Sequence, residues 1–308
     1  MTGKIRIITP DKATDTGAPN LQVERINLFV FFNLVLVVAS GIFFETRIIA
    51  GSFLLETVML MLTLVWIKTQ GMGLKATLRL KRPSFKEIGI TLIVTATGIY
   101  VASFIDEVFR YYLQDLGTLP GLGISKPNNL RELILTLAVV ALLPALSEEA
   151  LFRGFVLKSY QRYLPAGKAI FLSALFFGLA HLSISNFWGP FILGILCGWL
   201  VCICNSIFPA IIAHFLNNAL TIIALYLTPK ESDIGIISGQ GLLFKIPPFI
   251  IAGLILLTVI LWFKPAVHDD YVAGLKFSVI LKHWSTWLLF ITFGIFAGWE
   301  LLSIWGRL

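Results

Sequence analysis

The sequence predicts an all-α membrane protein, a polytopic bundle of transmembrane helices with about eight or nine spans. The 308-residue chain is 57% hydrophobic and only 13% charged, with a mean hydropathy of +0.87, whereas soluble chains carry about 25% charged residues. Apolar runs of about 20 residues, the length that crosses a bilayer, also recur along the whole chain. We expect spans at residues 27–44, 50–67, 88–105, 132–152, 168–183, 189–205, 208–227, 245–263 and 284–303.

The span count depends on the sixth and seventh apolar runs. Only Asn205 to Phe208 separate them, so they form either two helices or one bent unit. Residues 1–25 are polar and lack the short apolar core of a cleavable signal peptide, and we expect them to be a cytoplasmic tail. Residues 26–308 then form a single integral membrane domain.

The net charge of +7 is distributed unevenly along the chain. If nine spans alternate, the basic segments share one side: the N-terminal tail, the loop 68–87, and the stretches after the fourth and eighth spans. By the positive-inside rule this side is the cytoplasm. The opposite loops hold the acidic residues Asp106, Glu107, Asp115, Glu231 and Asp233. This distribution predicts a lipid bilayer as the partner and excludes nucleic acid.

Two loops and three cysteines complete the outline. We expect the basic loop 68–87 to lie on the membrane surface, and residues 106–131 to form the longest outside connection. Because a structural zinc site usually takes four ligands, three thiols in an apolar run are expected to be small packing residues. They are Cys197, Cys202 and Cys204.

The fourth span carries the first candidate for chemistry, Glu148, Glu149 and Arg153. Charges inside a span are costly and call for a reason. Glu149 and Arg153 are four apart, so they share a helix face and can pair. Glu148 points about 100° away and keeps no local cation, which suits a carboxylate that carries protons. The alternative is that both glutamates reach water at the cytoplasmic end of the span.

Two histidines follow in the next apolar runs. His181 ends the run SALFFGLAHL, and His214 and Asn218 lie four apart in FPAIIAHFLNNALTII. Each motif has a structural alternative. His181 could be a buried histidine whose hydrogen bonds are all made within the core, and His214 and Asn218 could simply join neighbouring helices through hydrogen bonds.

Taken together, the three motifs predict one site. Spans four to seven are expected to be alone in burying a cluster of ionisable side chains. A glutamate that takes a proton from water, a histidine that orients this water, and a second histidine with an asparagine that stabilises an oxyanion suffice for hydrolysis. Because water is scarce in a bilayer, we expect the cavity to open to the cytoplasm. Counting along the spans, however, puts Glu148 and His214 near the cytoplasmic face and His181 nearer the far side.

At these residues the chain resembles the CAAX protease and bacteriocin-processing family, also called the Abi family of intramembrane proteases. The family pattern appears here as EEALFR at 148–153, FGLAH at 177–181 and HFLNN at 214–218, within a core of about residues 130–227. The resemblance implies an intramembrane endopeptidase that cleaves a membrane-associated or membrane-embedded protein, in a prokaryotic plasma membrane. It implies Glu148 as the base with His181 as its partner, Glu149 and Arg153 as supports, and His214 and Asn218 as oxyanion donors.

The resemblance leaves the role of a metal open. We expect no cofactor, because the commonest helical zinc signature, HExxH, is absent from the sequence. A divalent metal such as zinc remains possible, and its ligands would be Glu148, His181 and His214.

Two other functions compete with the protease. A non-catalytic membrane scaffold or bacteriocin-immunity protein could keep the fold, but it would not need all six polar residues. A proton-coupled carrier could use intramembrane carboxylates and histidines, but the sequence lacks the clear inverted repeats typical of carriers.

Overall fold

The computed structural model is helical between its loops and contains no strand in the part of the chain it describes, which confirms the all-α prediction. The described residues are 18–44, 47–119, 124–228, 238–263 and 276–306. The predicted tail lies mostly outside them, as do Pro120, Gly121, Gly123, Glu231 and Asp233.

The helices follow one another in chain order with short connections. They are α1 (Ala18–Phe43), α2 (Ile48–Thr69), α3 (Leu74–Thr77), α4 (Phe85–Leu113), α5 (Leu130–Thr136), α6 (Leu143–Glu149), α7 (Leu157–Gln161), α8 (Ala166–Ala180), α9 (Trp188–Cys204), α10 (Phe208–Leu227), α11 (Gly239–Trp262), α12 (Phe277–Lys282) and α13 (Trp284–Ile304). A 3-10 turn, η1 (Gln114–Leu116), follows α4. Two π-helical segments, η2 (Leu137–Leu142) and η3 (Ala150–Val156), join α5, α6 and α7 into one continuous rod.

Seven helices of the described chain are long and apolar enough to cross a membrane. Each coincides with a predicted span. The fifth and sixth predicted spans correspond to α8 and α9, which are apolar but have only 15 and 17 residues. At 1.5 Å per residue, α8 is about 22 Å long and shorter than the roughly 30 Å hydrocarbon core. The count of eight or nine therefore included two helices that are too short to cross unaided.

Three predicted boundaries are corrected. The first helix begins at Ala18, inside the predicted tail. Helix α4 runs to Leu113, so Asp106 and Glu107 are helical instead of lying in a loop. Asn205 separates α9 from α10 with a positive φ of 46°, a conformation that asparagine tolerates better than most residues. These are therefore two helices and not one bent unit.

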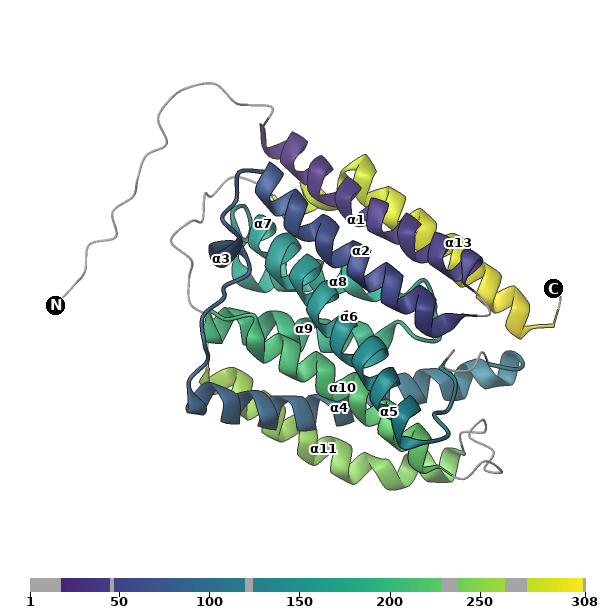
Figure 1. The fold of residues 1–308 in the computed structure, drawn as a ribbon. Helices are drawn as coiled ribbons and strands as arrows, with labels where there is room; N and C mark the ends of the chain where they lie inside the picture. The colour runs from purple at the N-terminus through teal and green to yellow at the C-terminus, as the bar shows by residue number, and fades with distance from the viewer. Residues whose placement is uncertain (1–17, 45–46, 120–123, 229–237, 264–275, 307–308) are drawn as a thin grey trace.

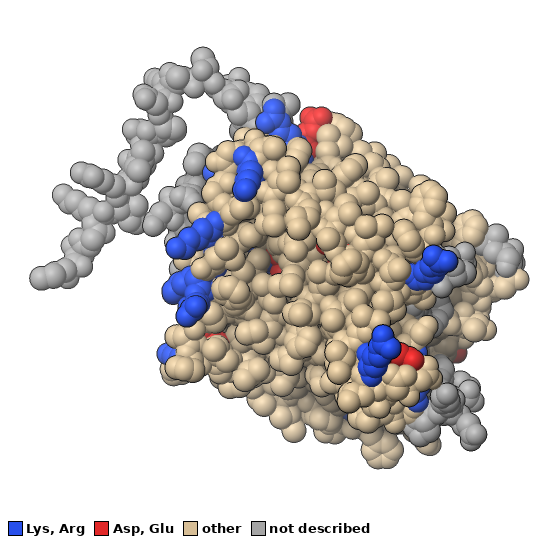
Figure 2. Space-filling view, in the orientation of Figure 1, with Lys and Arg blue, Asp and Glu red and all other residues tan. Residues whose placement is uncertain are grey.

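The helices pack as a bundle whose flank is apolar. Figure 1 shows α1, α2 and α13 along one side, α4 and α11 along the other, and the remaining long helices between them. Lys and Arg gather at the end where α3 and α7 lie, while the flank is almost uncharged (Figure 2). Large hydrophobic side chains are exposed on the outer helices, among them Phe53 of α2, Ile251 of α11 and Trp299 of α13. An apolar exterior between polar ends is the surface of an integral multi-pass membrane protein.

The basic loop between α2 and α4 is docked onto the end of the bundle. Arg79 is buried with a positive φ of 48°, and its side chain donates a hydrogen bond to Gln161 of α7. The Ile207 N–H donates to the Arg79 carbonyl at 3.3 Å, and the Ser206 hydroxyl donates to the Lys81 carbonyl at 2.6 Å. The loop therefore covers the α9–α10 turn and closes this end of the bundle.

Helices α8 and α9 cross closely at two glycines. A Cβ at Gly194 would lie 3.0 Å from the Ala174 Cα and 3.1 Å from the Arg153 Nη2, and one at Gly198 would lie 3.1 Å from the Ile170 Cγ2. Small residues allow such crossings because the backbones can approach. The cysteines of α9 are buried beside this crossing, as predicted.

Replacing Gly198 by leucine should therefore lower the thermal stability of the protein in detergent, because overpacking a filled interior costs about 1–3 kcal/mol or more. Gly294→Leu is the matched control, since a Cβ at Gly294 meets nothing within 4 Å. Equal unfolding temperatures for the two variants would refute the tight crossing.

Candidate active site

One polar cavity of about 530 Å³ collects the sequence motifs. Its walls come from α2, α4, the α5–α7 rod, α8, the start of α9, and α10. Glu148, His181, His214 and Asn218 line it directly, and Glu149 with Arg153 lies fully buried behind His214. The structure therefore brings all six predicted residues together.

Glu149 is the centre of a buried hydrogen-bonded triad. Its Oε1 accepts a hydrogen bond from Arg153 Nη1 at 2.9 Å and another from His214 Nδ1 at 2.8 Å. Glu149 and Arg153 are each 0% exposed. The predicted pairing of Glu149 and Arg153 is confirmed, and the additional contact with His214 ties the α5–α7 rod to α10.

This triad fixes the chemistry of the His214 ring. When Nδ1–H donates to Glu149, Nε2 is left to face the cavity. The Nε2 atom lies 3.8 Å from Glu148 Oε2. His214 therefore presents Nε2 at the cavity wall, and the bond to Glu149 sets its direction.

Glu148 differs from its neighbour Glu149 in its access to the cavity. Its Oε2 is buried and has no hydrogen-bond partner in the described part of the chain, and its side chain remains 19% exposed along the cavity. A carboxylate oxygen left unsatisfied calls for a partner such as water. Of the two glutamates, Glu148 is the one free to act on a bound molecule.

His181 closes α8 with an imidazole whose orientation is fixed by the helix end. Its backbone N–H bonds to the Gly178 carbonyl, which leaves the Phe177 carbonyl available to the imidazole Nδ1 at 3.0 Å. Nδ1 must then be the protonated nitrogen, because a carbonyl only accepts. Nε2 of the neutral ring is therefore an acceptor.

Phe177 holds the two histidines and the arginine in one cluster. Its ring meets those of His181 and His214 edge to face, with centroids 5.1 and 5.6 Å away. The Arg153 guanidinium lies over it at 4.3 Å, a favourable cation–π arrangement. The depth difference expected between His181 and His214 does not separate them, because both rings contact this one phenylalanine.

Asn218 is placed by a proline in the opposite helix. Pro144 has no N–H to donate to the Val140 carbonyl, its i−4 partner in a regular helix, and the π-helical segment η2 ends just before it. The Asn218 Nδ2 approaches this carbonyl at 3.5 Å, while Asn217 donates to Asn218 Oδ1 at 3.0 Å. Asn218 thus meets the backbone of the α5–α7 rod, and Asn217 joins it on the cavity wall.

Two further carboxylates were missed by the sequence analysis. Glu56 of α2 is buried, bonds to the Ser147 hydroxyl and lines the cavity. Glu300 of α13 accepts from the Ile184 N–H at 2.6 Å and from the Ser183 hydroxyl at 3.1 Å, which anchors the loop after His181. Each was visible as a lone acid inside an apolar run. Spans four to seven are therefore not alone in burying ionisable groups.

The cavity opens at the end of the bundle remote from α3. The C-terminal part of α4 supplies Ser103, Asp106, Glu107 and Arg110, and the loop before α9 supplies Asn186. The basic residues gather at the opposite end (Figures 1 and 2). Two expectations, a cytoplasmic basic end and a cavity open to the cytoplasm, therefore cannot both hold.

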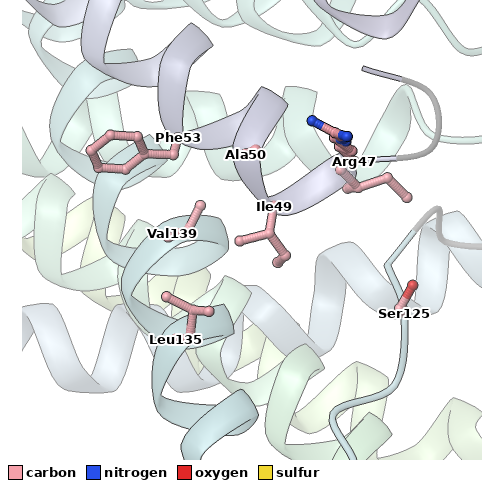
Figure 3. A pocket seen from close by; sticks show the side chains of 8 residues that line it. Arg47, Ile49, Ala50, Phe53, Ser125, Leu135 and Val139 are labelled. Carbon is pink, nitrogen blue, oxygen red and sulfur yellow. The ribbon is translucent and has the colours of Figure 1, made fainter.

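A second cavity, of about 570 Å³, lies between the start of α2 and the rod, outside the site. Figure 3 shows Ile49, Leu135 and Val139 turned toward one another there, with Arg47 beyond them. None of the six predicted residues lines it. The chemistry of the motifs is therefore confined to the polar cavity.

The predicted metal ligands do not fit a metal in this arrangement. Among the described residues, no three His, Cys, Asp or Glu side chains are grouped so that they could hold a metal ion. The chemistry of the site is therefore derived from the protein side chains alone.

Arg153→Ala should strongly destabilise the protein, because it leaves the Glu149 carboxylate buried without its cation, a loss of about 3–5 kcal/mol. Thermal unfolding in detergent measures it. Lys245→Ala is the matched control, since its pair with Glu107 is partly exposed and should contribute about 0–1 kcal/mol. An Arg153→Ala protein as stable as the control would show that the pair is not structural.

Comparison with protein families gives one match. Residues 130–220 match the model of the type II CAAX prenyl endopeptidase Rce1-like family. This stretch begins at α5 and ends within α10, and it contains all six predicted site residues. Searches of curated proteins and of solved structures found no match. Through residues 130–220 the chain is thus similar to the Rce1-like family of CAAX endopeptidases, in agreement with the resemblance of its three motifs.

Proposed function

We propose that this protein is an intramembrane endopeptidase in which Glu148 activates the water that attacks a peptide bond. The family match supports an intramembrane protease. The single observation that carries the finer proposal is the contrast between the two glutamates. Each has an Oε2 without a partner in the described structure, but Glu149 is 0% exposed and is engaged through Oε1 by Arg153 and His214. Glu148 instead lines the cavity, and its side chain is 19% exposed.

The first half of the reaction uses Glu148 and His181. Glu148 accepts one proton from a water molecule, and the unprotonated Nε2 of His181 accepts a hydrogen bond from the other water hydrogen. The water oxygen then forms a bond to the carbonyl carbon of the substrate, and the carbonyl oxygen becomes an oxyanion. General-base assistance of this kind contributes about 10²–10⁴-fold.

The second half uses His214. In this step His214 acts with both nitrogens protonated: Nδ1–H donates to Glu149 and Nε2–H donates to the oxyanion, and one such donor contributes about 10²–10³-fold. The C–N bond then breaks, and Glu148 returns its proton to the leaving nitrogen. The products are a carboxylic acid, which ionises by releasing its proton to water, and an amine, and the enzyme is restored.

The remaining residues of the site support this hydrolysis. Arg153 balances the charge of Glu149, and Phe177 holds both imidazoles. Asn217 and Asn218 provide amide groups on the same wall, of which Asn218 also meets the Val140 carbonyl. The substrate is a membrane-associated or membrane-embedded polypeptide, because the cavity lies inside an apolar bundle.

Glu148→Gln should reduce cleavage by at least about 10²–10⁴-fold, because the amide keeps the size of the side chain but cannot accept the proton. The measurement is hydrolysis of a fluorogenic peptide library by the detergent-solubilised protein. Glu24→Gln on α1, away from the cavity, is the matched control and should cleave at the wild-type rate.

The same assay contains the contrary outcomes. Full activity of Glu148→Gln in a folded protein would eliminate Glu148 as the base, whereas the absence of cleavage by the wild-type protein would favour a non-catalytic scaffold. Loss of activity on adding a strong chelator, with recovery on adding zinc, would identify a metal enzyme. The glutamate mechanism predicts the wild-type rate in both conditions.

A further inference from the structure

The end of the bundle that carries α3 is closed to the cavity. The basic loop crosses it, with Arg79 buried against Gln161 and with the Ser206 and Ile207 contacts beneath. Tyr160, Ser206 and Gln161 are all buried at this end. Any passage from here to Glu148 would have to break these contacts.

Exposure of the cavity lining increases in the opposite direction. Glu149 behind the cavity is 0% exposed, His214 3% and Glu56 6%. Ser103, Asn186 and Thr221 are exposed, and they lie on the C-terminal part of α4, the loop before α9 and the C-terminal half of α10. The cavity is therefore a well that is deepest at the glutamates and open at its far end.

The rim of this well is polar and is held by hydrogen bonds. The Gly189 N–H donates to Asp106 Oδ1 at 3.3 Å, and Lys245 Nζ of α11 donates to both oxygens of Glu107 at 2.6 and 2.7 Å. Arg110 and Asn186 complete the rim. Side chains of both signs and an amide suit a hydrated polypeptide, and a wholly apolar ligand would leave them unsatisfied.

The two ends of the bundle differ in charge. The α3 end carries Arg25, Lys68, Lys75, Arg79, Lys81, Arg82, Lys86, Lys158, Arg162, Lys168, Lys276 and Lys282. The open end carries fewer described bases: Arg47, Arg110, Lys126, Arg131 and Lys245. Excess Lys and Arg in short loops remain in the cytoplasm during insertion. The closed end is thus the cytoplasmic one.

We propose that the well opens to the non-cytoplasmic side, and that its substrate is a membrane-anchored polypeptide whose cleaved segment lies at or just inside that face. The substrate class rests on the proposed function, whereas the side of the opening rests on the closed basic end and the exposed polar rim. A cytoplasmic tail would meet the docked loop and could not reach Glu148.

Two single-residue variants of the full chain test on which side of the membrane the well opens. Asn186→Cys puts a thiol on the rim and Lys75→Cys puts one on α3, and both positions are exposed. The native cysteines are buried, so the unmodified chain serves as the blank. A membrane-impermeant maleimide is applied to intact cells and then again after lysis in detergent.

The proposal expects Asn186→Cys to react fully in intact cells and Lys75→Cys to react only after lysis. The reverse pattern would overturn it. Failure of Asn186→Cys to react even after lysis would overturn it too, because the rim would not be open to water. None of these labelling results depends on catalytic activity.

A second arm adds an impermeant fluorogenic peptide outside intact cells, with Glu148→Gln as the blank. Cleavage from outside supports the proposed access. Cleavage only after lysis would overturn the access while the proposed function stands. No cleavage in either condition, by a chain whose Asn186→Cys reacts from outside, would overturn the proposed function and leave the orientation intact.

Discussion

The Glu149 carboxylate, buried between Arg153 and His214, is the interaction on which the site depends. It accepts from the Arg153 guanidinium one helical turn away and from the His214 imidazole of another helix. Removing a charge from water is costly, and a buried pair repays this only with good geometry and further hydrogen bonds. The second bond to His214 meets this requirement, and it orients the imidazole toward the cavity. A structural interaction thereby positions a chemical group.

The packing around the triad follows from the space that it needs. Gly194 leaves room for the guanidinium, Phe177 covers its face, and the short helix α8 brings His181 to the same phenylalanine. Because α8 ends at Ala180, the loop after it reaches the cavity wall, where Glu300 anchors it. The polar well therefore exists where two apolar helices are too short to fill the bundle.

Much of this could be predicted from local spacing. The apolar runs predicted the nine long helical segments, and the four-residue interval between Glu149 and Arg153 predicted their ion pair. The contact of Glu149 with His214 could not be predicted, because 65 residues separate the two and spacing along the chain says nothing of helix rotation. Glu56 and Glu300 were missed because an isolated acid has no motif. The end of the bundle at which the cavity opens could not be predicted, since it depends on how the loop at Arg79 docks.

The central claim is that the two adjacent glutamates have different roles: Glu149 stabilises the structure, and Glu148 takes part in the reaction. The most direct measurement compares the unfolding temperatures of Glu149→Gln and Glu148→Gln in the same detergent. The account predicts a large decrease for Glu149→Gln, because Arg153 loses its buried counter-charge. Glu148→Gln should unfold at or above the wild-type temperature, because it removes the charge of a carboxylate whose Oε2 has no hydrogen-bond partner in the described structure. Equal decreases for both variants, or a decrease for Glu148→Gln alone, would contradict the account.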